Sequence, residues 1–173
     1  YTPLSPLLFL TSAVSVGLPM VIFEASLATV LFKRKPETEL LADIAKYIPL
    51  FLGTYLLLRI GDLAYRGVLA QAFDGSVQGN SFLVEFALFA VPYFMLKRRK
   101  IRRDALKLFL CAFSVILGVV LNRFNVFLIG MDMGPEFNYF PSVGEFAVTF
   151  AFLAFGVFLY RLGVNYLPIL EEQ

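Results

Sequence analysis

The stretch YLLLRIGDLAYRGVL, residues 55–69, places three charged side chains inside an apolar run. A charge at the centre of a bilayer costs roughly 3 kcal/mol, so these side chains need partners. Tyr55, Arg59, Asp62 and Arg66 are spaced by four, three and four residues, which puts them on one face of a helix. The stretch therefore predicts a membrane helix whose polar face meets other helices of the same bundle.

The composition places the whole chain in a membrane. It has 173 residues, of which 59% are hydrophobic and 16% are charged, whereas soluble domains are about 45–50% apolar and about 25% charged. A spanning helix needs about 20 apolar residues. Five candidate runs occupy residues 6–32, 48–70, 81–96, 105–129 and 143–168. We expect an all-α polytopic transmembrane bundle that forms one domain over residues 1–173.

The connections between these runs differ in charge, and this predicts an orientation. Eleven of the fifteen Lys and Arg residues lie in or beside the first and third connections, including the run KRRKIRRDALK at residues 97–107, whereas the second and fourth connections hold Asp74, Asp132 and Glu136. The positive-inside rule then predicts a periplasmic N-terminus and a cytoplasmic C-terminus. Each basic run abuts a span, so we interpret it as an orientation and lipid-headgroup signal and expect no nucleic-acid partner.

The residue types that usually hold metals are scarce. The chain has one cysteine, Cys111, and no histidine, so we expect no disulfide and no iron–sulfur or zinc site. Histidine is the usual axial ligand of a membrane b-type haem. We therefore expect that this chain binds neither haem nor a metal of its own.

Charged residues in four of the spans predict a polar line through the bundle. Intramembrane ionisable residues mark functional paths by default, and five of them are assigned to a proton pathway or buried charge network: Glu24, Arg59, Asp62, Glu85 and Arg123.

Two other interpretations of this line stay open. The charged pairs can be purely structural, since interhelical polar contacts average about 0.6 kcal/mol, and paired charges at mid-membrane also mark transporter substrate paths. Asn122 and Asn125 share a helix face with Ser114 and Gly118, which favours close helix contact over a site.

Three segments carry a resemblance to a known family. PLLFLTSAVSVGLPMVIFEASL (residues 6–27), LRIGDLAYRGVL (58–69) and LNRFNVFLIG (121–130), followed by YFPSVGEFAVTFAFLAFGVFLYRLGVNYLPIL (139–170), resemble the NrfD/polysulfide-reductase membrane-subunit family. The resemblance is greatest to its HybB-like branch, the membrane subunits of periplasm-facing nickel–iron hydrogenases. It runs over nearly the whole chain, which resembles the C-terminal half of such a subunit, and HybB-like sequences also carry charges where this chain has its five pathway residues.

The resemblance implies a function in a multi-pass subunit of a bacterial or archaeal cytoplasmic membrane. Such a subunit is not a catalyst on its own, so no catalytic residue is expected here. It couples electron transfer from a periplasmic ferredoxin-like iron–sulfur subunit and hydrogenase catalytic subunits to membrane quinone, without a redox cofactor of its own. Asp132, Glu136 and Tyr139 lie in the connection that would contact the periplasmic partner.

The same resemblance limits what this chain can hold. In polysulfide-reductase relatives the quinone pocket lies largely in the first helix bundle. That bundle corresponds to an N-terminal membrane half, which by this resemblance we expect to lie outside residues 1–173. We therefore expect the quinone site in that half and the charged line in this one. A structural anchor, or a subunit of a related polysulfide-reductase-like or quinol-oxidising complex, is the alternative.

Overall fold

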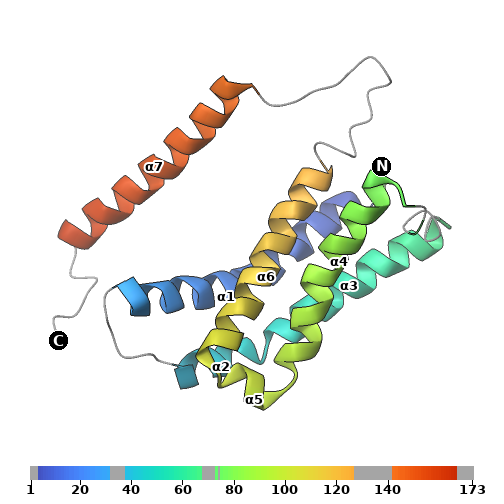
Figure 1. The fold of residues 1–173 in the computed structure, drawn as a ribbon, viewed down its shortest axis with the longest axis horizontal. Coiled ribbons are helices and arrows are strands. Elements are labelled where there is room, and N and C mark those ends of the chain that lie inside the picture. The colour runs from blue at the N-terminus through green and yellow to red at the C-terminus, as the bar shows by residue number, and fades with distance from the viewer. Residues whose placement is uncertain (1–3, 32–37, 68–72, 74, 127–141, 167–173) are drawn as a thin grey trace. The chain divides into compact units, whose positions relative to one another are not determined.

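The computed structural model describes residues 4–31, 38–67, 73, 75–126 and 142–166, and the regular structure in these ranges is helical (Figure 1). Five helices of this part of the chain are long and apolar enough to cross a membrane, which confirms the expected all-α membrane fold. Contacts between residues divide the chain into two units, Tyr1–Met131 and Asp132–Gln173. The helices are α1 (Ser5–Leu31), α2 (Thr38–Ala45), α3 (Ile48–Tyr65), α4 (Val77–Leu96), α5 (Arg99–Arg102), α6 (Ala105–Phe124) and α7 (Val143–Tyr166).

The first unit is a bundle of four long helices. α1 packs against α3 and α6, and α4 packs against the same two helices, so each helix has its neighbours in the chain as its neighbours in space. Short connections between antiparallel neighbours are typical of up-and-down bundles. The short helices α2 and α5 contact each other, and the end of the bundle that they form is called the basic end below.

The core of this unit is a thin apolar column. Only 28–33% of the spanning window of each of its long helices is buried within the chain, which leaves broad apolar faces for lipid. The largest buried apolar side chains are those of Tyr55, Phe89, Ile22, Ile48, Leu52, Leu96, Leu108 and Val115.

A close contact between α4 and α6 depends on Gly118. A Cβ atom added at Gly118 would lie 3.1 Å from Cζ of Phe89 and 3.2 Å from Cβ of Leu88. Small residues let membrane helices approach closely. Asn122 lies one turn after Gly118 on α6, and Glu85 lies one turn before Phe89 on α4. The close contact therefore brings the side chains of Asn122 and Glu85 to the same level.

Polar side chains cap the N-termini of two helices of the first unit. Ser76 accepts a hydrogen bond from the backbone N–H of Gly79 at 3.0 Å, and Asp104 accepts one from Lys107 at 3.2 Å, which are N-caps of α4 and α6. Hydrogen bonds from Lys107 hold the pKa of Asp104 below its usual range, so the stabilising contribution of this cap is present at neutral pH and is lost as the pH falls through that lowered pKa.

The basic end contains more structure than the sequence predicted. The first connection, expected as a loop, includes α2, whose Leu41, Ala42 and Ala45 are buried. In the third connection Arg102 donates hydrogen bonds to the carbonyl oxygens of Leu96 at 2.6 Å and Lys97 at 3.3 Å. These contacts satisfy the C-terminal carbonyls of α4.

The ends of the spans also differ from the predicted runs. The second run was expected to reach residue 70, but α3 ends at Tyr65, and Gly67 follows at φ 67°, the left-handed conformation typical of a helix stop. The third run was expected to be short, but α4 begins at Val77 and has 20 residues. The fifth run corresponds to α7 of the second unit, which begins at Val143. The hydroxyl of the preceding Ser142 accepts a hydrogen bond from the N–H of Glu145 at 3.4 Å.

We expect the substitution Gly118→Ala to lower stability because the added methyl group must displace Phe89 or Leu88. Overpacking of this kind costs typically 1–3 kcal/mol. The measurement is the thermal unfolding midpoint in detergent. Gly61→Ala in α3 is the matched control, since no atom lies within 4 Å of its new Cβ. An equal loss in both variants would contradict the close contact of α4 and α6.

The predicted orientation can be tested with thiols at opposite ends of the first unit. In a Cys111→Ser background, Phe73→Cys lies between α3 and α4, and Lys100→Cys lies in α5, both at exposed positions. We expect a membrane-impermeant thiol reagent to label the Phe73 variant in intact cells and the Lys100 variant only after permeabilisation, because basic connections stay in the cytoplasm. The reverse labelling would show the opposite orientation.

Candidate functional site

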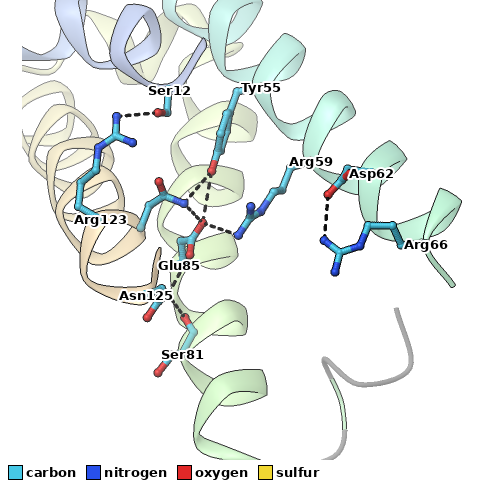
Figure 2. Close-up of polar contacts among 10 residues, drawn as sticks. Ser12, Tyr55, Arg59, Asp62, Arg66, Ser81, Glu85, Arg123 and Asn125 are labelled. Atoms are coloured by element: carbon cyan, nitrogen blue, oxygen red, sulfur yellow. Dashed lines mark hydrogen bonds and ion pairs between the residues drawn. The ribbon is translucent and has the colours of Figure 1, made fainter. Parts of the chain in front are cut away.

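Glu85 of α4 is the centre of a buried polar cluster in the first unit (Figure 2). Its side chain is 2% exposed, and three neighbours donate hydrogen bonds to it. The Tyr55 hydroxyl lies 3.3 Å from Oε1, Nδ2 of Asn122 lies 2.8 Å from Oε1, and Nδ2 of Asn125 lies 2.8 Å from Oε2. Nη2 of Arg59 forms an ion pair with Oε1 at 3.7 Å. These five residues are called the Glu85 cluster.

Three helices supply the cluster, and helical spacing explains how each does so. Tyr55 and Arg59 are four residues apart on α3, and Asn122 and Asn125 are three apart at the end of α6, so each pair shares a face. The Tyr55 hydroxyl also accepts a hydrogen bond from Nδ2 of Asn122 at 3.2 Å. The cluster therefore joins α3, α4 and α6 in the half of the bundle away from the basic end.

Arg123 makes a separate set of contacts toward α1. Its Nη2 donates to the Ser12 hydroxyl at 3.0 Å and to the carbonyl oxygen of Phe9 at 3.3 Å. Its guanidinium carbon lies 3.2 Å from the centroid of the Phe9 ring, a cation–π arrangement. Adjacent residues of α6 thus reach both the Glu85 cluster and α1.

Asp62 and Arg66 form a third polar contact near the end of α3. Their side chains are 3.7 Å apart, with Asp62 only 3% exposed and Arg66 39% exposed. Figure 2 shows this pair beside Arg59 and apart from the hydrogen bonds of Glu85. Asp62 therefore lies between the Glu85 cluster and the C-terminal end of α3, where Arg66 is exposed.

Two members of the cluster, and the neighbouring Arg123, are not fully satisfied by protein groups. Nε of Arg59, Nη1 of Arg123 and Oδ1 of Asn125 are buried and have no hydrogen-bond partner among the described residues. Buried polar atoms in native proteins are nearly always paired, and exceptions deserve a functional or structural explanation. A cluster whose only task was to hold helices together would gain stability from pairing these atoms.

The structure pairs two of the five residues assigned from sequence and places two more beside them. Glu85 and Arg59 are paired, and Arg123 and Asp62 flank them. Glu24 lies exposed on α1, and among the described residues it makes no hydrogen bond or ion pair with the cluster. Asp132, Glu136 and Tyr139 lie outside the described residues. The roles of all eight stay predictions.

Sequence reasoning missed the amides that hold Glu85. It interpreted Asn122 and Asn125 as helix-contact residues, although they are the two closest donors to the carboxylate. The available signal was their position on either side of Arg123 at the end of an apolar span. An amide costs less than a charge in a membrane, so it drew less attention than the ionisable residues.

Comparisons with known proteins reveal two relatives. The chain is 32% identical over 167 residues, 95% of its length and 43% of the relative's, to a "Probable Ni/Fe-hydrogenase 2 b-type cytochrome subunit" of Escherichia coli (strain K12). It is 28% identical over 185 residues, 100% of its length and 47% of the relative's, to a protein of Nitratidesulfovibrio vulgaris (strain Hildenborough). The chain thus spans about half the length of the curated relatives it matches.

Other comparisons gave no match. No protein-family model and no solved structure matches the chain. The HybB-like relation is supported by the Escherichia coli relative, while the resemblance to the wider NrfD family stays a prediction.

The expectation that this chain is a subunit without haem must be corrected. The Escherichia coli relative is named a b-type cytochrome subunit, and a b-type cytochrome carries haem. The earlier inference failed because it took the lack of histidine in 173 residues as decisive. A relative of which this chain spans only 43% can take its haem ligands from residues outside the aligned part.

Histidine, the usual axial ligand of a b-type haem, is absent from this chain. Within the described ranges, no group of three or more His, Cys, Asp or Glu side chains converges on a position where a metal ion could be held. Cys111 is packed in the apolar core of the first unit.

We expect the substitution Tyr55→Phe to destabilise the protein by about 1 kcal/mol, because Glu85 and Asn122 then lose a buried hydrogen-bond partner. The thermal unfolding midpoint in detergent measures this. Tyr93→Phe is the matched control, since the Tyr93 hydroxyl bonds the exposed Lys97 at 2.8 Å near the basic end. A larger loss for Tyr93→Phe than for Tyr55→Phe would contradict the importance of the cluster.

Proposed function

We propose that this chain forms part of the membrane subunit of a hydrogen-oxidising respiratory complex and that the Glu85 cluster transfers protons there. The observation that carries the proposal is a carboxylate 2% exposed inside a membrane bundle, held by donors from two other helices. Intramembrane carboxylates in such settings act by default as functional groups. The relation to a hydrogenase-2 membrane subunit supplies the redox context.

The chemistry of quinone explains why protons need a route. In the proposed complex, hydrogen is oxidised by partner subunits, electrons pass through an iron–sulfur subunit, and quinone takes up two electrons and two protons. The electrons travel between cofactors of the partners, whereas the protons require groups that bind and release them inside the bundle. A carboxyl group and a phenol are such groups.

The geometry of the cluster suits a proton carrier. The Tyr55 hydroxyl donates to Oε1 of Glu85 at 3.3 Å, so both exchangeable groups are in direct contact. Asn122 donates to both of them and fixes their relative position. Arg59 provides a positive charge at 3.7 Å that stabilises the ionised carboxylate when the proton has left.

The polar residues around the cluster extend the proposed route. Asp62, buried and paired with Arg66, is proposed to connect the cluster with the end of α3, and Arg123 to define its boundary toward α1. Glu24 is exposed on α1, so its proposed part in the route requires a neighbouring helix. We propose that such helices belong to an N-terminal membrane half, with residues 1–173 as one domain beside it.

The proposed partners follow from the same arrangement. By the positive-inside rule the basic end faces the cytoplasm and the Glu85 cluster lies in the periplasmic half of the membrane. An iron–sulfur subunit and the hydrogenase subunits would dock on the periplasmic side, and Asp132, Glu136 and Tyr139 are proposed to contact them. The quinone site is assigned to the N-terminal half.

A structural anchor is the competing function, and one observation favours it. The Glu85 cluster joins three helices at a single level, which is what interhelical polar contacts do in many membrane proteins. The unpaired buried atoms of Arg59, Arg123 and Asn125 favour the proton-transfer proposal instead.

The substitution Glu85→Gln distinguishes the two functions because it keeps the shape of the side chain and removes its exchangeable proton. We expect quinone-linked hydrogen oxidation by the purified complex to fall about a hundredfold, the scale of a lost acid–base group. Hydrogen oxidation with an artificial dye, which bypasses the membrane subunit, should be unchanged.

Asp104→Asn is the matched control for this measurement. It makes the same carboxylate-to-amide change at an exposed N-cap at the basic end, and asparagine is an equally good cap. Normal quinone-linked activity of Glu85→Gln would refute proton transfer through the cluster. A lower yield of complex, with both activities normal per complex, would establish the anchor.

A further inference from the structure

An apolar groove lies at the basic end of the first unit, far from the Glu85 cluster. It has a volume of about 550 Å³ and is formed by the C-terminal half of α1, α2 and the start of α6. Its lining is largely aliphatic and aromatic, with Leu27, Leu41, Leu106 and Phe109 among the residues. Leu27 and Leu106 are 41% and 66% exposed, so the groove is open on the outer surface of the first unit.

A polar cleft is formed by other residues of α2 together with α5. It has a volume of about 110 Å³ and is lined by three arginines near α5, Arg99, Arg102 and Arg103, and by Glu39 and Asp43 of α2. The ion pairs among the described residues involve none of these five side chains. The cleft therefore carries one more positive than negative charge, and its arginines are not neutralised by direct pairing.

The groove and the cleft are lined by residues that are neighbours in the sequence. Leu41 lines the groove and the next residue, Ala42, lines the cleft. Likewise Arg103 of the cleft is two residues from Ala105 of the groove. A single elongated molecule with one charged end can therefore contact both.

We propose that this end of the protein binds an anionic phospholipid, with its phosphate at the arginines of the cleft and an acyl chain in the apolar groove. Basic pockets between membrane helices at the cytoplasmic side are typical sites for acidic headgroups. The arginine guanidinium matches phosphate through paired N–H donors. This inference does not depend on the proposed function, because the groove and the cleft share no residue with the Glu85 cluster.

The charge balance of the cleft predicts which lipid is preferred. Three arginines with two carboxylates leave a single positive charge, which suits a headgroup with one negative charge, such as that of phosphatidylglycerol. Glu39 and Asp43 limit the additional attraction that a headgroup with several negative charges would gain from the arginines. A zwitterionic lipid would fill the groove equally well but would gain nothing from the surplus positive charge.

The test uses the complete membrane complex, extracted in mild detergent and stripped of loosely bound lipid. Native mass spectrometry and the thermal unfolding midpoint are recorded after adding phosphatidylglycerol, phosphatidylcholine or inorganic phosphate. We expect phosphatidylglycerol to be retained and to raise the midpoint, and the other two to do neither. Equal effects of both lipids, or of inorganic phosphate and phosphatidylglycerol, would overturn the proposal.

Two variants locate the site. Arg99→Gln combined with Arg103→Gln should weaken binding of phosphatidylglycerol by roughly thirtyfold, since each basic residue near an anionic surface contributes about fivefold. Arg98→Gln combined with Lys100→Gln removes the same charge from exposed positions outside the cleft and should bind nearly as the unmodified protein does. Equal weakening in both pairs would show a diffuse electrostatic attraction and overturn the site.

A groove variant tests the acyl-chain contact separately. Thr29 lines the groove, and Thr29→Phe should fill part of it and reduce retention of phosphatidylglycerol, while leaving binding of a short-chain, soluble analogue with the same headgroup unchanged. Full retention of the long-chain lipid in this variant would refute the groove as the seat of the acyl chain. Loss of the short-chain analogue as well would refute the separation into headgroup and chain sites.

Discussion

The carboxylate of Glu85, enclosed in a membrane bundle, is the constraint on which the first unit depends. Lipid offers it no hydrogen bonds, so its partners must come from the protein. α3 provides Tyr55 and Arg59, and α6 provides Asn122 and Asn125. To satisfy one side chain, three helices must meet at one level with a defined rotation about their axes.

Packing and polarity cooperate in meeting this requirement. Gly118 lets α6 approach Phe89 of α4 one turn before the two helices share the Asn122–Glu85 contact. The small residue thus sets the distance, and the polar pair sets the rotation. Among the described residues, the basic end has no such buried charge. Its helix ends are satisfied instead by Arg102 and by the N-cap Asp104.

The spans could be predicted because their signal is local. Runs of apolar residues and helical periodicity lie within one segment of the chain, so five helices and the shared face of Tyr55 and Arg59 follow from sequence. The partners of Glu85 could not be predicted because the rotation of one apolar helix against another is not a local property. The same limit explains why Glu24 was grouped with residues that it does not contact.

Two other errors have different causes. Helix α2 was missed because its eight residues lie in a connection that was interpreted from its basic charges alone. Its buried alanines stabilise the helix only through contact with neighbouring helices, which the local sequence does not reveal. The inference against haem argued from a missing residue type in a chain that spans about half of its relatives. Absence of a ligand from one part of a subunit is weak evidence about the whole.

The neighbour order of the bundle has a consequence for biosynthesis. Membrane helices emerge from the ribosome in chain order, so α3 and α4 enter the bilayer before α6. Until α6 arrives, Glu85 has Tyr55 and Arg59 as partners but lacks both asparagine amides. An insertion intermediate that stalls at this stage retains a half-solvated anion within the hydrocarbon, the kind of defect that cellular quality control removes. Insertion of α6 therefore supplies the last partners of Glu85 and marks the bundle as correctly assembled.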